Sequence, residues 1–109
     1  MKPIDPQAAM ETMWKIAPEF AKAKGERVYL EEARKSLKAV LMKKCGLEAI
    51  GAQEREAYAH DDYQTYLQGL QAAVEREESL KWRLIAAQAA IDIWRTTESS
   101  NRAIDRAAR

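Results

Sequence analysis

The apolar residues of this chain recur at spacings of three and four along most of its length, which is the period of an α-helix. The longest stretch with this period lies between residues 62 and 105, where there is no proline and Gly69 is the single glycine. Asp61 precedes it as a predicted N-cap, with Gln64 in the capping-box position. We therefore predict one long C-terminal helix over 62–105.

The first half of the chain contains shorter stretches of the same period. Asp5 is a predicted N-cap, and Pro6 suits the first helical position, where no backbone N–H is needed. Pro18 is expected to end or kink this helix, and the next helix is expected to stop at Gly46. The predicted elements are a short N-terminal helix (1–25), a basic helix (26–45), a short helix or turns (46–61) and the long helix (62–105). The residues predicted to form a buried seam are Leu30, Leu37, Leu41, Leu67, Leu70, Leu84, Ile91 and Trp94.

The composition supports a helical fold. Alanine accounts for 20 of the 109 residues, whereas there are only 4 glycines and 3 prolines. Together Ala, Glu, Lys, Leu and Arg make up about half of the chain, which is typical of long helices and coiled coils. The length allows one domain at most. We predict an all-α fold in a single domain, 1–109: an elongated helical hairpin or bundle with one long C-terminal helix.

The segment 80–94 is apolar on two faces of its predicted helix. The second face carries Trp82, Ile85, Ala89 and Ile93. A helix that is apolar on two faces has to be covered on two sides, so this face needs either a folded-back segment or a second copy of the chain. We predict self-association through these four residues, giving a helical homo-oligomer. A monomeric bundle that wraps both faces is the alternative.

Candidate catalytic chemistry is sparse. Cys45 is the single cysteine and His60 the single histidine, which leaves no intrachain disulfide and no histidine-pair zinc motif. His60 with Glu56, Asp61 and Asp62 can form a weak site for a hard cation, but the two aspartates are better explained as the start of the long helix, where negative charge is favourable. We predict no enzyme activity, no catalytic residues, no cofactor and no metal site.

The composition and the N-terminus also bear on location. No segment approaches the ~18 apolar residues that a membrane span needs. The N-terminal residues lack the apolar core of a signal peptide. The formal net charge of +1 gives the whole chain no field directed at nucleic acid or an anionic membrane. We therefore expect a cytoplasmic protein with no membrane partner.

The aromatic residues allow two interpretations. Aromatic side chains interleaved with basic residues can stack on the bases of single-stranded nucleic acid. In an alanine-rich helical protein the same side chains more often fill gaps in the core. We favour core packing and predict that the tryptophans in particular, Trp14, Trp82 and Trp94, are buried.

The arginines near the C-terminus have a regular spacing. At 100° per residue Arg95, Arg102, Arg106 and Arg109 lie within about 60° of one another on a helix. Such a row suits a phosphate backbone, since arginine binds phosphate through two parallel hydrogen bonds. The alternative is a solvated face with intrahelical pairs such as Asp92–Arg95. The predicted nucleic-acid contacts are Arg95, Arg102 and Arg106 here and Arg34, Lys35 and Lys38 on the basic helix.

Three segments resemble a group of small proteins of tailed phages and prophages. They are residues 29–42 (YLEEARKSLKAVLM), 54–60 (EREAYAH) and 93–103 (IWRTTESSNRA). The resemblance covers roughly residues 27–104 and implies an accessory protein similar to those encoded near recombination and replication genes.

These observations predict a non-enzymatic phage accessory protein. It is expected to act in phage DNA metabolism by binding a host or phage protein partner, nucleic acid, or both, and the resemblance implies that the expected cytoplasm is that of a bacterial host cell. The alternatives are a pure protein–protein module that inhibits a host protein, and a component of virion assembly. Salt-dependent binding to single-stranded DNA separates the first from the others, because only phosphate contacts release counterions in proportion to their number.

Overall fold

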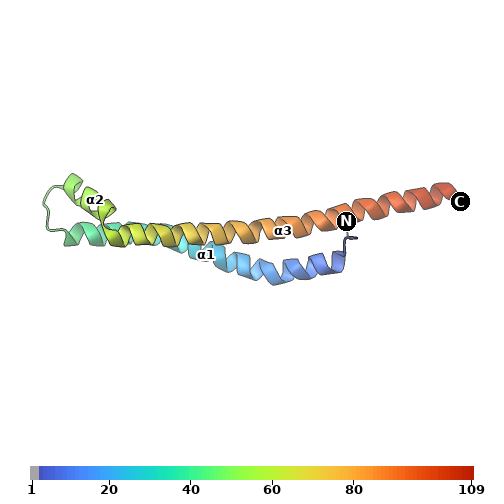
Figure 1. Ribbon diagram of the computed structural model, residues 1–109, viewed down its shortest axis with the longest axis horizontal. Coiled ribbons are helices and arrows are strands. Elements are labelled where there is room, and N and C mark those ends of the chain that lie inside the picture. The colour runs from blue at the N-terminus through green and yellow to red at the C-terminus, as the bar shows by residue number, and fades with distance from the viewer. Residues whose placement is uncertain (1–2) are drawn as a thin grey trace. The chain divides into compact units, whose positions relative to one another are not determined.

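The computed structural model describes residues 3–109, and all regular structure in this range is α-helical. Helix α1 spans Pro6–Lys44, α2 spans Ile50–Ala59 and α3 spans Asp61–Ala108 (Figure 1). The all-α class and the long C-terminal helix are therefore confirmed, and α3 is 48 residues long.

Helix α1 is one continuous helix, so the predicted boundary at residue 25 is wrong. It passes through Pro18, whose missing N–H removes one backbone hydrogen bond at a cost of about 3 kcal/mol. Ile16 before the proline and Ala23 after it are each 1% exposed. Because the helix is held by packing on both sides of Pro18, these contacts outweigh the local penalty. Pro18 itself is exposed.

The ends of α1 follow the sequence pattern. The Asp5 carboxylate accepts hydrogen bonds from the backbone N–H groups of Gln7 and Ala8, at 3.0 and 3.2 Å, as an N-cap does. The helix ends after Lys43 and Lys44, and Gly46 adopts a positive φ of 74°. A left-handed residue just beyond a helix favours glycine, because glycine has no Cβ to clash.

The start of α3 differs from the prediction by one residue. His60, and not Asp61, is the N-cap: its Nδ1 accepts a hydrogen bond from the Asp62 N–H at 3.0 Å. The Gln64 side chain, predicted to complete a capping box with Asp61, donates instead to the carbonyl of Tyr58 at 2.8 Å. Only His60 separates α2 from α3. The two side chains therefore form hydrogen bonds with backbone groups at the end of α2 and at the start of α3, which helix geometry leaves without partners.

Packing divides the described residues into two compact units. Unit 1 consists of residues 3–21 and 79–109, and unit 2 of Lys22–Glu78. Each unit contains part of α1 running antiparallel to part of α3, and unit 2 also contains α2 (Figure 1).

The core of unit 2 lies where α2 meets the other two helices. Leu41, Ala57 and Tyr63 are its buried residues, and Leu37, Met42 and Leu67 pack against them. The Tyr63 ring also meets the Tyr58 ring edge to face, with centroids 5.2 Å apart. The Tyr66 hydroxyl donates a hydrogen bond of 2.6 Å to the Leu30 carbonyl, which ties α3 to α1.

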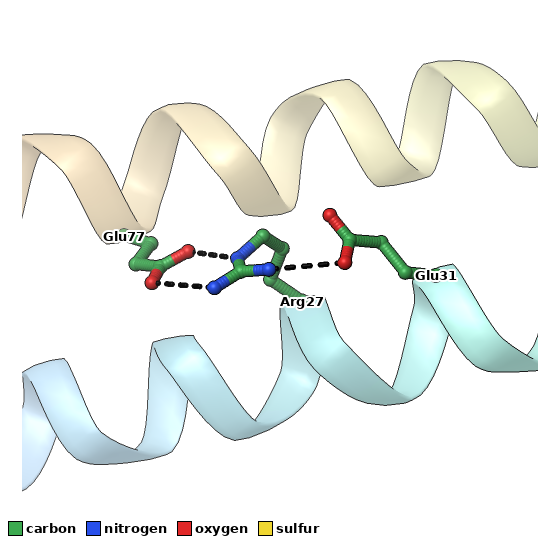
Figure 2. A network of polar contacts seen from close by, with 3 residues as sticks. All are labelled: Arg27, Glu31 and Glu77. Carbon is green, nitrogen blue, oxygen red and sulfur yellow. Dashed lines mark hydrogen bonds and ion pairs between the residues drawn. The ribbon is translucent and has the colours of Figure 1, made fainter.

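A charged pair joins α1 and α3 in the same unit (Figure 2). Arg27 binds the Glu77 carboxylate through two of its nitrogens and also donates to Glu31 at 3.0 Å. Glu77 is 8% exposed and occupies a position at which the helical pattern would otherwise place an apolar residue. Hydrogen bonding to Glu77 is the main cause that raises the pKa of Arg27, followed by hydrogen bonding to Glu31. The guanidinium therefore stays charged and compensates a carboxylate that is largely removed from water.

The core of unit 1 is thin and leaves large apolar side chains exposed. Its buried residues are Ile16, Leu80, Ala87 and Ile91. The tryptophans, predicted to be buried, are 65% exposed at Trp14, 60% at Trp82 and 36% at Trp94. The buried residues of this core are thus small or aliphatic, and the larger indole rings lie outside it. Leu41 and Ile91 of the predicted seam are buried, its other leucines are partly buried, and Trp94 is exposed.

Candidate interaction surfaces

An apolar groove runs between α1 and α3 in unit 1. It has a volume of about 450 Å³. The residues that line it are Met10, Met13, Trp14 and Ala17 from α1 and Leu84, Gln88, Ile91 and Arg95 from α3. The three α1 residues 10, 13 and 17 follow helical spacing, so they share one side of the helix. Methionine side chains are flexible and adapt to the shape of a bound group, which suits a binding groove.

The arginines of the C-terminal segment extend the α3 side of this groove. At 100° per residue Arg95, Arg102, Arg106 and Arg109 point in the same direction as Leu84 and Ile91, to within about 60°. Helix α3 continues to Ala108, so the helical persistence that their alignment requires is present. All four are exposed, and three of them surround a shallow hollow together with Asp105. Arg95 lies 3.9 Å from Asp92, the intrahelical pair expected from the sequence.

A third surface lies on the opposite side of α3 from α1, and we refer to it as the outer face. Trp82, Ile85, Ala89 and Ile93, the residues predicted for self-association, all lie on it and are exposed. At 100° per residue it is a sector about 120° wide, and no charged residue falls in it between positions 79 and 107. The residues of the outer face are Ser79, Trp82, Ile85, Ala86, Ala89, Ile93, Thr96, Thr97, Ser100, Ala103, Ile104 and Ala107.

The basic residues predicted in unit 2 lie together, and the two lysines among them are engaged within the chain. Arg34, Lys35 and Lys38 line a hollow with Tyr58 and Tyr63. Lys35 pairs with Glu32 at 3.2 Å and Lys38 with Glu54 at 3.6 Å. The Lys38 ammonium also lies 4.7 Å from the centre of the Tyr58 ring, and its contact with Tyr58 is the main cause that raises its pKa. A phosphate at this hollow would compete with these internal contacts.

The residues around His60 form a separate hollow in unit 2. Leu41, Cys45, Glu56, His60 and Asp62 line it, together with Lys44. The Cys45 thiol donates a hydrogen bond to the Met42 carbonyl at 3.1 Å. Within residues 3–109 no group of three His, Cys, Asp or Glu side chains is arranged to hold a metal ion.

The groove is the feature that sequence reasoning missed. Its α1 side is visible in the sequence as the stripe Met10, Met13, Trp14 and Ala17, which helical periodicity assigns to a packed face. The structure leaves Trp14 and Met10 exposed beside α3 instead. How much of this apolar stripe α3 covers depends on the packing of the two helices. The sequence pattern alone does not give that packing.

Comparison with known proteins gives no family for this chain. No family model, curated protein or solved structure matches it. Among the described residues no helix combines the length and apolar character needed to cross a membrane.

Proposed function

We propose that this chain is a non-enzymatic accessory protein, of the phage type implied by its sequence, that acts by binding macromolecules. The exposure of large apolar side chains on unit 1 carries this proposal. Trp14, Trp82, Ile93 and Ile104 are each at least 55% exposed. Trp14 lies at the groove and the other three lie on the outer face, and exposed apolar surface of this kind marks interaction sites in proteins that are otherwise well solvated.

The outer face supports assembly of the chain into a homo-oligomer. Within it the residues 79, 82, 86, 89, 93, 96, 100, 103 and 107 alternate spacings of three and four, which is the heptad pattern of a coiled-coil seam. Small side chains at most of these positions allow two helix backbones to approach closely. A second copy of α3 would cover Trp82 and Ile93 without introducing any charge into the contact.

If the chain self-associates through the outer face, a single charge at the centre of this face should strongly weaken association. Ile93→Lys places an ammonium group in the middle of the outer face, where a second copy would desolvate it. We expect association to weaken about 100-fold or more, so that the variant sediments as a monomer at high micromolar concentration, where the parent does not. Analytical ultracentrifugation measures this. Ile50→Lys is the matched control, since Ile50 is 69% exposed on α2 and outside the outer face.

Equal sedimentation of the parent and of Ile93→Lys contradicts assembly through this face. A parent chain that is a monomer throughout contradicts it as well. Helix content should be unchanged in both variants by circular dichroism, because both side chains are exposed and lysine is a good helix former.

Nucleic-acid binding is the second candidate, and the row of arginines on an exposed part of α3 favours it. If Arg95, Arg102 and Arg106 bind phosphates, each substitution by alanine should weaken binding to single-stranded DNA similarly for all sequences. Each should also reduce the slope of log K against log salt by about one phosphate contact. Filter binding or fluorescence anisotropy over a range of salt concentrations tests this. If the parent binds no DNA at low salt, or if the triple variant binds as the parent does, the candidate is wrong.

A further inference from the structure

We infer that the groove of unit 1 and the arginines beyond it form one binding surface for an acidic amphipathic helix of a partner protein. This inference rests on the proposed role in macromolecular binding and names the class of partner. The surface consists of the groove residues and of Arg102, Arg106 and Arg109.

The apolar half of this surface has the dimensions of a helix face. Leu84 to Arg95 on α3 covers about 16 Å at 1.5 Å per residue, or three helical turns. A helix that presents apolar side chains at i, i+3 or i+4, and i+7 matches this length. Trp14 is 65% exposed beside the groove and offers a large ring that a partner side chain can cover, which is typical of residues that dominate binding energy.

The charged half begins where the apolar half ends. Arg95 lines the groove itself, and Arg102 and Arg106 follow on the same side of α3 over about another 16 Å. Residues 99–109 are all exposed, and this end of α3 extends beyond the first turn of α1 (Figure 1). The row presents four guanidinium groups against three acidic residues of the same helix segment, Asp92, Glu98 and Asp105. Both side chains of the Arg95–Asp92 pair are exposed, so the pair contributes little to stability. Arg95 is therefore available to bind a partner.

Charge complementarity therefore selects the partner. A phosphate backbone would bind the arginines and leave the adjoining groove open to water, whereas a helix with apolar residues in one half and Asp or Glu in the other fills both. The acidic half is best placed at the N-terminal end of the partner helix, because carboxylates there also interact favourably with the helix dipole. This orientation makes the partner helix antiparallel to α3.

The test uses the full-length chain and a fluorescently labelled helical peptide as the probe. In the peptide, leucines occupy one face of the C-terminal half and glutamates the same face of the N-terminal half. A second peptide carries lysines in place of the glutamates, and a labelled single-stranded oligothymidylate is the third probe. We expect the acidic peptide to bind and the basic peptide to bind at least tenfold more weakly, as measured by anisotropy.

Matched variants connect binding to the two halves of the surface. Trp14→Ala should weaken binding of the acidic peptide about tenfold, and the pair Arg102→Ala with Arg106→Ala by a similar factor that shrinks at high salt. Arg83→Ala is the control, since Arg83 is an exposed arginine of α3 on a different side of the helix. It should leave peptide binding unchanged.

Several results would overturn the inference. They are no binding of the acidic peptide, equal binding of both peptides, or no effect of Trp14→Ala on peptide binding. Binding of the oligothymidylate alone, lost in the arginine variants, would assign the row to phosphate and would leave the proposed binding function intact. If no probe binds and the chain is also a monomer, the proposed function fails as well.

Discussion

Arg27→Met is expected to lower the free energy of unfolding at neutral pH, and by more than the loss of an exposed ion pair does. The reason lies in Glu77, which is 8% exposed and would lose the guanidinium that compensates its charge. Urea unfolding followed by circular dichroism measures the loss.

A second substitution separates this charge effect from a packing effect. In the double variant Arg27→Met with Glu77→Leu both charges are gone and the contact becomes apolar, so most of the lost stability should return. Lys35→Met is the matched control, because Lys35 forms an exposed pair with Glu32 whose loss should cost less than about 1 kcal/mol. If the single and the double variant are equally unstable, Glu77 does not depend on Arg27 in the way that their contacts indicate.

Ile16→Ala is expected to destabilise unit 1 by about 3 kcal/mol, the usual cost of removing a buried isoleucine side chain down to Cβ. Ile16 is 1% exposed and is the largest side chain that is fully buried among the described residues. All three tryptophans lie in unit 1, so tryptophan fluorescence during urea unfolding reports on this unit. The measurement should be made at one fixed protein concentration, because the proposed self-association would add to the apparent stability.

The control for this prediction is the same substitution at an exposed isoleucine. Ile50→Ala, at a residue 69% exposed in unit 2, should change stability by less than about 0.5 kcal/mol. A loss at Ile16 that is no larger than at Ile50 would show that α1 does not pack on α3 through Ile16. The thin core of unit 1 makes the effect of one such residue easy to detect.

The local features of the fold could be predicted from the sequence. The cap at Asp5, the end of α1 before Gly46 and the uninterrupted helix after His60 all depend on residues within one or two turns of each other. Their physical causes are short-range: a carboxylate that accepts backbone N–H groups, a glycine that tolerates positive φ, and an absence of helix breakers. Helical spacing also places Trp82 and Ile93 on one face of α3, but it gave no sign that this face is exposed, and the predicted burial of Trp82 was wrong.

Only the tertiary structure decided how the helices pair, and the rest of the site depends on that pairing. Whether α1 continues through Pro18 depended on Ile16 and Ala23, whose burial no local pattern reveals. Arg27 and Glu77 are 50 residues apart in the chain, and sequence periodicity marks Glu77 merely as an interruption. The groove beside Trp14 arises for the same reason: a helical pattern shows which side of a helix is apolar, but the packing of α1 on α3 determines how much of that side is covered.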